Sequence, residues 1–288
     1  MGERQYLHLV KKIIKTGMRE KGRNGNTLSI LGGHMRFSLE NRKIPFVTTK
    51  KLAWKSCLKE LLWFIGGETN NKILQDQNVK IWNGNSSREF LDSRGLTFKE
   101  NDLGPVYGHQ WRFYNAKYDN CDTDYTGKGV DQLQNVIDGI NETKKTGISS
   151  RRLLLSTWNP EQLDEMALPP CHVLSQFFVH DNTLSCALYQ RSGDVGLGIP
   201  FNIASYGFLT HLLAKHCELE AKEFIHFIGN AHIYEDHIPS LMHQINREPL
   251  AEPNVEIQRK GDINDYLFND FKINDYKHYG GIKMDMRA

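Results

Sequence analysis

Two long segments of the chain have apolar residues spaced as on one face of an α-helix. Residues 52–65 carry such a stripe and are followed by two glycines, and residues 203–217 carry a second stripe. This spacing predicts a helix over each segment. The apolar positions are Trp54, Leu58, Leu61, Leu62 and Ile65 in the first and Tyr206, Leu209, Leu212 and Leu213 in the second.

Apolar and polar residues alternate in residues 173–180 and again in residues 183–190. This period predicts two strands, and Asp181-Asn182 between them is suited to the two-residue turn of a hairpin. Residues 152–158 predict a further strand before the hairpin. Residues 255–288 offer short alternating strands and no closing element.

The predicted hairpin has a register that its short turn fixes. Extended along both strands, the register puts His172 opposite Arg191 and Cys171 opposite Ser192. Side chains that are directly opposite on one sheet face lie about 5 Å apart. We therefore expect a thiol to lie beside a guanidinium and a hydroxyl.

Two polar stretches, residues 83–102 and 115–129, predict long loops or insertions. Core-forming segments lie on both sides of each, so we expect residues 1–288 to form one domain. Helices and strands are mixed without a βαβ rhythm, and the clearest strand pair is antiparallel. These features favour an α+β fold over a doubly wound sheet.

Composition narrows the class of protein. Of 288 residues, 39% are hydrophobic and 24% are charged, which suits a folded domain with a sizeable core. The net charge of +2 argues against nucleic acid as the main partner. No run of about 18 apolar residues occurs, so no membrane span is expected. Five cysteines without a Cys-x-x-Cys motif indicate reduced thiols in a cytoplasmic protein, with a nuclear location left open.

Cys171 is the candidate nucleophile. A free cysteine taken alone is more often a small buried hydrophobe. Nearby cations favour the reactive thiolate, however, and the predicted register brings Arg191 close. The register and the Pro-Pro that precedes Cys171 favour the functional interpretation.

Four arginines, Arg23, Arg151, Arg152 and Arg191, stand in glycine-bearing loops or at strand edges. Each alone is most often a solvated surface residue. Several beside a nucleophile indicate a phosphate site, because the forked guanidinium matches phosphate oxygens. The sequence has no P-loop and no Gly-x-Gly-x-x-Gly motif, which argues against an NTPase or a dinucleotide-binding Rossmann protein.

Glu60 and Asn202 each have two interpretations. Glu60 is either the polar member of a helix face or a carboxyl wedged between aromatic rings, whose pKa desolvation would raise for proton transfer. Asn202 stands where the N-cap of the second helix belongs. Its amide also donates and accepts at once, which suits the edge of a uracil ring.

His232 and Tyr234 would share one strand face, where structural pairs are commoner than ligand-binding ones. Tyr107 lies in a segment that predicts a turn and then a strand, and it is either a core aromatic or a site residue. The chain has 12 histidines but no His-Glu-x-x-His motif and no zinc-finger spacing. No metal site is expected.

Together these motifs resemble the thymidylate synthase family from about residue 4 to the C-terminus. The loops at 83–102 and 115–129 resemble those of the longer, eukaryotic-type members. The stretches that carry the resemblance are Glu60-Leu61-Leu62-Trp63-Phe64, Asp102-Leu103-Gly104-Pro105-Val106-Tyr107-Gly108, Ser150-Arg151-Arg152, Pro170-Cys171-His172, Leu188-Tyr189-Gln190-Arg191-Ser192-Gly193-Asp194, Pro200-Phe201-Asn202-Ile203-Ala204-Ser205-Tyr206 and Ala231-His232-Ile233-Tyr234.

The resemblance implies a homodimer packed through a large mixed, mainly antiparallel sheet flanked by helices. It implies a methyltransferase that makes dTMP from dUMP, with 5,10-methylenetetrahydrofolate as cosubstrate, dihydrofolate as product and no metal. Cys171 would add to carbon 6 of the uracil ring. Glu60 would organise water and protons, and Tyr107 would help to remove the proton from carbon 5.

The resemblance also implies the binding residues. Arg191, Ser192 and Arg23 would hold the dUMP phosphate, and Arg151 and Arg152 would reach the phosphate in the partner subunit's site. The further nucleotide contacts would be His172, Gln190, Asn202 at the uracil edge, and His232 with Tyr234 at the deoxyribose hydroxyl. The folate contacts would be Lys50, Trp82, Asp194 and the tail residue Ala288.

Four positions depart from the family pattern. None touches the nucleophile, but they bear on the phosphate contact of Arg23 and on closure of the tail over folate. They are the loop from Arg23 to Thr27, which is one residue short, Asn83 in place of the aspartate that usually follows the tryptophan, Asn230 in place of an aspartate before His-x-Tyr, and the ending Arg287-Ala288.

Two other functions stay open. A pyrimidine nucleotide hydroxymethylase on the same fold would add a one-carbon unit without oxidising folate. An aspartate at position 202 would better match a cytosine amino group, so Asn202 favours uracil. A nucleotide- or RNA-binding protein without catalysis is disfavoured because every expected catalytic side chain is present. RNA binding as a second activity has no support in the sequence.

Overall fold

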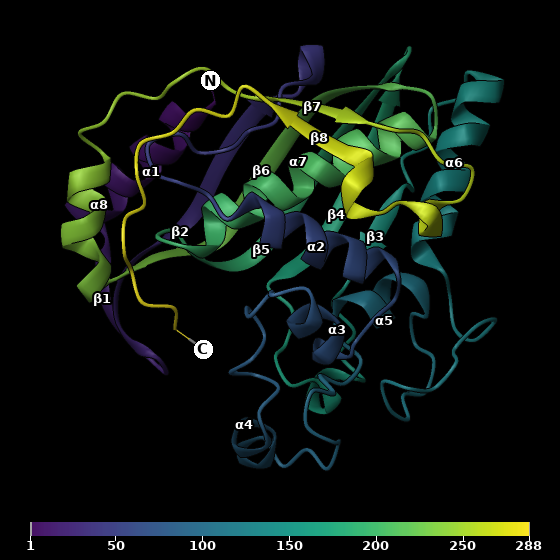
Figure 1. The fold of residues 1–288 in the computed structure, drawn as a ribbon, viewed down its shortest axis with the longest axis horizontal. Helices are drawn as coiled ribbons and strands as arrows, with labels where there is room; N and C mark the ends of the chain where they lie inside the picture. The colour runs from purple at the N-terminus through teal and green to yellow at the C-terminus, as the bar shows by residue number, and fades with distance from the viewer. Residues whose placement is uncertain (1, 288) are drawn as a thin grey trace.

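The structure, a computed structural model, describes residues 2–287. A six-stranded sheet in the order β1-β2-β6-β5-β4-β3 forms its centre, and β7 pairs with β8 in a separate small sheet (Figure 1). The helices are α1 (Glu3–Thr16), α2 (Trp54–Ile65), α3 (Asn71–Asp76), α4 (Arg88–Ser93), α5 (Tyr107–Arg112), α6 (Gln132–Thr146), α7 (Gly198–His216) and α8 (Ile238–Gln244). The strands are β1 (Met18–Gly22), β2 (Gly25–Ser38), β3 (Leu154–Ser156), β4 (His172–His180), β5 (Thr183–Asp194), β6 (Glu220–Tyr234), β7 (Asn254–Ile257) and β8 (Phe271–Asn274).

The large sheet is mixed. Within the described residues β5 and β6 run parallel, and its other neighbouring strands run antiparallel. α7 lies along β5 and β6, and α2 packs on α7 (Figure 1). The predicted α+β fold with a large, mainly antiparallel sheet is confirmed.

α7 is buried almost all round because it lies between the sheet and α2. Phe208 and Leu212 in its middle are both 0% exposed. A helix that is apolar on every side is typical of such a central position. This packing holds in place the N-terminal end of α7, which carries Asn202.

The structure begins α7 earlier than the sequence predicts, at Gly198 rather than at residue 203. Pro200 belongs to its first turn, where a backbone N–H has no intrahelical partner and proline is tolerated. Asn202 therefore lies inside the helix. Its interpretation as the N-cap is wrong.

The hairpin of β4 and β5 forms as predicted at its turn end, where His180 pairs with Thr183. A β-bulge between His172 and Leu174 shifts the register, so that His172 pairs with Gln190. The carbonyl of Cys171 accepts a hydrogen bond from the backbone N–H of Arg191 at 2.9 Å.

The predicted pairs, His172 with Arg191 and Cys171 with Ser192, are therefore wrong by one residue. A bulge adds a residue to one strand and moves every later pair. Its effect here is to place Cys171 directly across from Arg191.

The segment around Tyr107 is also not a strand. It forms the short helix α5, which buries Tyr107 and Trp111. β3 is shorter than the predicted strand over residues 152–158.

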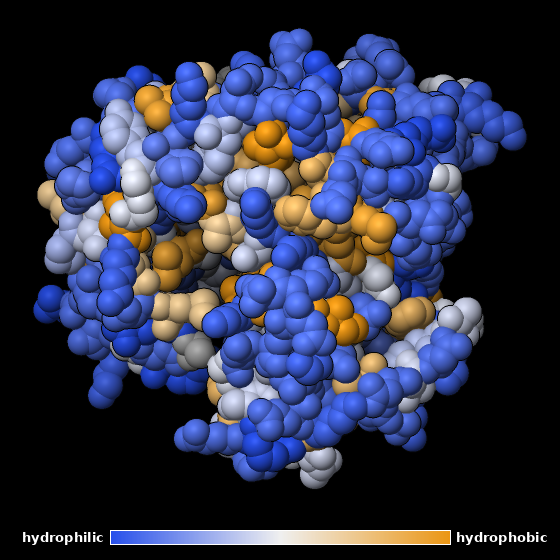
Figure 2. Space-filling view, viewed as in Figure 1, coloured by the Kyte–Doolittle hydropathy of each residue, from blue (hydrophilic) through white to orange (hydrophobic). Residues whose placement is uncertain are grey.

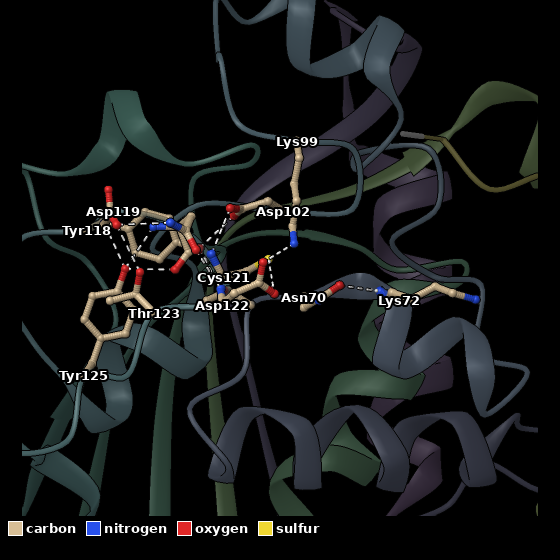
Figure 3. A network of polar contacts seen from close by, with 12 residues as sticks. Asn70, Lys72, Lys99, Asp102, Tyr118, Asp119, Cys121, Asp122, Thr123 and Tyr125 are labelled. Atoms are coloured by element: carbon tan, nitrogen blue, oxygen red, sulfur yellow. Dashed lines mark hydrogen bonds and ion pairs between the residues drawn. The ribbon is translucent and has the colours of Figure 1, made fainter.

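Hydrogen bonds and an ion pair join the two polar stretches, residues 83–102 and 115–129 (Figure 3). The first contains α4, and the second is loop. The buried carboxylate of Asp102 accepts hydrogen bonds from the backbone N–H of Gly104 at 2.9 Å, the hydroxyl of Tyr118 at 2.7 Å and the N–H of Cys121 at 2.9 Å. Lys99 and Asp122 form an ion pair beside them. This clamp fixes the turn that leads into α5 and hence the position of Tyr107.

The surface is hollowed between the part that carries α3 and α4 and the body that carries the C-terminal tail, and apolar residues lie on its walls (Figure 2). The tail runs beside α8, where the hydroxyl of Ser240 donates to the carbonyl of Lys283 at 3.0 Å (Figure 1).

Candidate active site

Cys171 lies just before β4 and is partly exposed. Its backbone N–H donates a hydrogen bond to the Tyr107 hydroxyl at 2.8 Å. Tyr107 is the first residue of α5, so this bond joins the start of that helix to the end of the sheet. A thiol and a phenol from distant parts of the chain are thereby brought together.

Arg191 is held beside the thiol by the two prolines that precede Cys171. Its Nε donates to the carbonyl of Pro170 at 2.8 Å, and Nη2 donates to the carbonyl of Pro169 at 2.9 Å. The guanidinium also lies over the Trp158 ring, 5.5 Å from the centroid. These contacts orient the cation before any ligand binds.

Arg23 occupies the turn between β1 and β2 and is exposed. Its Nε donates to the side chain of the neighbouring Asn24 at 3.1 Å. Together, Arg23 and Arg191 act on the pKa of the Cys171 thiol.

Burial raises the pKa of Cys171, and the positive charges of Arg191 and Arg23 oppose that rise. The cations therefore act in the direction that the sequence predicts, but desolvation outweighs them. Desolvation and nearby positive charges have opposite effects on the pKa of a thiol, and here the net result is a raised pKa.

Glu60 lies on α2 with a buried carboxyl, which accepts a hydrogen bond from Trp82 Nε1 at 2.7 Å. Burial raises the pKa of Glu60 to about 7, and the bond from Trp82 acts in the opposite direction. A carboxyl with such a pKa exchanges a proton readily near neutral pH. Of its two interpretations, the desolvated carboxyl is the one that the structure matches.

Aromatic rings line the site around Tyr107. Tyr107 stacks on Phe64 with centroids 4.7 Å apart and meets Trp82 edge-on at 6.0 Å. The His172 ring lies 5.2 Å from the Tyr107 ring. Burial raises the pKa of Tyr107, so its hydroxyl keeps its proton at neutral pH.

Gln190 is the centre of a buried polar network. Its Nε2 donates to Asn202 Oδ1 at 3.0 Å, and its Oε1 accepts from His226 Nε2 at 2.8 Å. Burial lowers the pKa of His172 to about 4 and that of His226 to about 3, so both rings are neutral. The Asn202 amide is thus oriented by uncharged partners.

His226 was missed by the sequence reasoning. It lies on β6, on the same strand face as His232 and Tyr234, because all three are an even number of residues apart. Extending the His232–Tyr234 alternation backward along the strand was the signal that could have found it.

Asp194 ends β5 and pairs with His232 across the parallel strands. Its Oδ1 accepts from the backbone N–H of Gly196 at 2.8 Å and lies 3.8 Å from His237 Nδ1. His237 Nε2 in turn donates to the carbonyl of Asp285 at 2.8 Å. The tail is therefore connected to Asp194 through one imidazole.

Lys50 lies near Asp194, with its ammonium bonded to the carbonyl of Gly196. Burial lowers the pKa of Lys50 to about 8, while Asp194 and Glu3 act in the opposite direction. Glu3, which the sequence reasoning missed, holds the preceding loop: its carboxylate accepts from the backbone N–H groups of Thr48 at 2.8 Å and Thr49 at 2.9 Å.

Some predicted site residues lie away from the groups above, and one lies outside residues 2–287. Arg151 and Arg152 are exposed in the segment before β3, and the described part of the chain gives their side chains no bond to the residues above. Ser192 is partly exposed opposite Asn230. Ala288 lies outside the described residues. Arg287 pairs with Asp236 and lies over the Tyr234 ring.

Residues 2–287 contain neither a metal-binding cluster nor a helix that could span a membrane. Within that range, no group of three or more His, Cys, Asp and Glu side chains is arranged to hold a metal ion. In the same range, the helices are too short or too polar to cross a membrane.

The family model described as thymidylate synthase matches residues 4–288. The chain belongs to the thymidylate synthase family. The predicted family is therefore confirmed.

Several curated members of the family are similar over 99% of this chain. Human thymidylate synthase is 51% identical over 288 residues, and the chain covers 90% of it. Thymidylate synthase 1/2 of Encephalitozoon cuniculi is 47% identical over 290 residues and is 97% covered. A bifunctional dihydrofolate reductase-thymidylate synthase of Paramecium tetraurelia is 49% identical over 286 residues, but the chain spans only 61% of its length. The bifunctional relatives of Leishmania major and Zea mays are 55% and 54% covered.

Proposed function

We propose that this chain makes dTMP from dUMP by reductive methylation, with 5,10-methylenetetrahydrofolate as cosubstrate and dihydrofolate as the second product. The observation that carries the proposal is the 2.8 Å contact between Cys171 and Tyr107. The bond runs from the Cys171 backbone N–H to the Tyr107 hydroxyl, and it supports the proposal because it brings the thiol-bearing residue next to a phenol, so that both can act on the same small ring.

Cys171 is the nucleophile. Its thiolate adds to carbon 6 of the uracil ring, and the electron pair of the double bond moves to carbon 5 and the neighbouring carbonyl. Carbon 5 is then electron-rich enough to take the one-carbon unit. The carbon 5 proton is lost as the bond between the one-carbon unit and the folate nitrogen breaks. Hydride from the folate then adds to the methylene, and the sulfur leaves carbon 6 as thiolate, which restores the ring double bond. The folate supplies the one-carbon unit and the hydride that reduces it to methyl, which is why dihydrofolate is released.

Tyr107 and Glu60 handle the protons. The Tyr107 oxygen already accepts the N–H of Cys171, so its own hydrogen is free to donate toward the ring or a water. The pKa of Glu60, raised to about 7 by burial, lets this carboxyl take up or release a proton near neutral pH. The aromatic wall limits competing water around both groups.

Asn202 recognises the pyrimidine edge. Its Oδ1 accepts one bond from Gln190 and keeps a second lone pair, and its Nδ2 supplies donors. An amide held in this orientation matches the N3–H donor and O4 acceptor of uracil, whereas cytosine has an N3 acceptor and an amino donor at the same two positions. This supports dUMP over dCMP and argues against the hydroxymethylase alternative.

Membership of the thymidylate synthase family supports the remaining contacts. Arg191, with Arg23 and Ser192, binds the phosphate, and His172 and Gln190 line the ring pocket. His232 and Tyr234 bind the deoxyribose hydroxyl. The folate is bound by Asp194, Lys50 and Trp82, with the tail and its Ala288 closing over it.

The active form is a homodimer packed through the large sheet. Phe178, Tyr189 and Phe227 are 48%, 47% and 43% exposed, and Tyr189 pairs directly with Phe227. Neighbours along the same strands are buried under α7, so these rings lie on the opposite sheet face. An exposed apolar face of this kind supports packing against a second copy.

In this arrangement Arg151 and Arg152 reach the phosphate in the partner's site. A Phe178→Arg variant tests it: we expect a monomer by light scattering that has lost activity. A fully active monomer would contradict the shared site. The five free cysteines support a cytoplasmic location, with a nuclear one as the alternative.

The test of the reaction is optical. The protein is mixed with 5,10-methylenetetrahydrofolate and either dUMP or dCMP, and dihydrofolate is followed by its absorbance. We expect dihydrofolate with dUMP only. Consumption of the folate without dihydrofolate would instead indicate a hydroxymethylase, and silence with both nucleotides in a folded protein would leave the binding-only alternative.

A further inference from the structure

Asn230 links His232 to a residue outside the site described so far. His232 Nδ1 and Asn230 Oδ1 lie 3.0 Å apart, and Asn230 Nδ2 donates to Glu20 Oε2 at 3.3 Å. Glu20 comes from β1, at the edge of the sheet. The contact therefore passes across β2, whose Ser29 is the direct partner of His232.

A carboxylate can only accept hydrogen bonds, whereas an amide has one accepting and one donating end. Because Glu20 accepts, it must face Asn230 Nδ2. Asn230 Oδ1 must then face His232, and an oxygen there requires the proton on His232 Nδ1. The charged form of Glu20 is favoured, because hydrogen bonds from Ser29 and Asn230 lower its pKa.

The His232 ring carries a single proton. Burial lowers the pKa of His232, and Asp194 only partly opposes this effect. With that proton on Nδ1, the opposite nitrogen Nε2 has a free lone pair. It can accept a hydrogen bond from a hydroxyl but cannot donate one.

We propose that Glu20 is a positioning residue for the nucleotide: it orients the Asn230 amide and so fixes the His232 tautomer that accepts the sugar hydroxyl. The proposal rests on the proposed function, because it takes the hydroxyl of dUMP as the ligand. An aspartate at position 230, which is common in the family, would accept from His232 by either oxygen. An asparagine there needs an external acceptor to orient it, and Glu20 supplies that acceptor.

Three variants separate this role from a general effect of charge. In Glu20→Lys a pure donor faces Asn230, so the amide turns and the His232 proton moves to Nε2. In Glu20→Gln an accepting oxygen remains, so the wild-type tautomer is kept. Adding Asn230→Asp to Glu20→Lys restores an acceptor toward both neighbours and returns the proton to Nδ1.

The first readout is ¹⁵N NMR of the His232 ring in the protein alone, which distinguishes the two tautomers without any activity. We expect protonated Nδ1 in wild type, in Glu20→Gln and in the double variant, and protonated Nε2 in Glu20→Lys. An unchanged Nδ1 proton in Glu20→Lys would overturn the proposal. This readout holds even if dUMP proves not to be the substrate.

The second readout is the dissociation constant for dUMP divided by that for its 2′,3′-dideoxy analogue. The ratio cancels the long-range effect of the new charge on the phosphate. We expect Glu20→Lys to raise the ratio by about tenfold, roughly the contribution of one hydrogen bond, with recovery in the double variant. Equal weakening of both ligands would overturn the link to the hydroxyl. If neither nucleotide binds the wild type, the proposed function fails while the tautomer result stands.

Discussion

The site has a buried half and a cationic rim, and they are built differently. Glu60, Tyr107 and Gln190 are 6%, 6% and 2% exposed, and each is held by a hydrogen bond to a residue of another element or loop. Arg23 and the pair Arg151-Arg152, by contrast, are exposed. The groups that we propose for proton transfer and ring recognition thus come from one chain, whereas the proposed phosphate-binding rim is exposed and includes residues from the proposed second subunit.

Arg191 belongs to both parts. The carbonyls of Pro169 and Pro170 orient it like a member of the buried half, and its charge serves the rim. The two halves also have opposite effects on the thiol, because burial raises the pKa of Cys171 and the cations oppose the rise. The pKa of the Cys171 thiol therefore depends on both halves of the site.

The largest effect should follow removal of the sulfur. Cys171→Ser should lower kcat to below about one thousandth of wild type, because the hydroxyl is a far weaker nucleophile. The fold should be kept, since Tyr107 bonds to the backbone N–H and not to the side chain. Steady-state rates with circular dichroism as the control check this, and a near-normal rate would remove Cys171 from the mechanism.

Glu60→Gln tests the buried half alone, because it should change how the stability of the protein depends on pH. The folded-state pKa of Glu60, about 7, lies above its usual 4.5, so the folded protein binds the proton more tightly. Wild-type stability should therefore fall as pH rises from 4.5 to 7, by up to about 3 kcal/mol relative to Glu60→Gln. Urea unfolding across this range measures the difference.

The exposed Glu142→Gln on α6 is the matched control for that experiment and should follow wild type. If the free energy of unfolding of wild type and of Glu60→Gln changed equally with pH, Glu60 would not be a desolvated carboxyl with a raised pKa.

Asn202→Asp tests ring recognition in the buried half. An aspartate keeps the oxygen that accepts from Gln190 but loses the amide donors. The dUMP/dCMP ratio of kcat/KM should fall by about tenfold or more. An unchanged preference would limit Asn202 to supporting Gln190.

The smallest effect concerns the rim. Arg191→Ala and Arg23→Ala should both raise the pKa of Cys171, with the larger change for Arg191, and slow alkylation by iodoacetamide at pH 7 by roughly threefold to tenfold. The rate is followed by mass spectrometry of the Cys171 peptide. Arg259→Ala, whose partner is Glu218 at 3.2 Å, is the control and should alkylate like wild type. Equal alkylation rates in all variants would show that Arg191 and Arg23 do not affect the pKa of Cys171.

Much of the fold could be predicted from local pattern. The α2 stripe and the alternation in β4 and β5 appear in the structure close to their predicted bounds. The bulge beside Cys171 could not be predicted, because it depends on pairing across the sheet. No glycine or other turn residue marks it in the sequence. α5 has only six residues, too few to show a helical period, and the turn before it is held by bonds from Tyr118 and Cys121 to Asp102.

The site shows the same division. Cys171 and Arg191 were near enough in the hairpin to be paired from sequence, apart from one residue of register. The bond from Trp82 to Glu60 and the links from Gln190 to Asn202 and His226 join separate elements. Tertiary packing alone brings them together, so their partners could not be read from spacing.

The most direct test of the central claim, that Cys171 attacks the pyrimidine ring, is covalent trapping. In 5-fluoro-dUMP a fluorine replaces the hydrogen that must leave carbon 5, so a ring that Cys171 has attacked should remain attached when methylenetetrahydrofolate is also present. Peptide mass spectrometry should find the adduct on Cys171 and none in Cys171→Ser. An adduct on another cysteine, or turnover of dUMP with no adduct on any, would contradict the account.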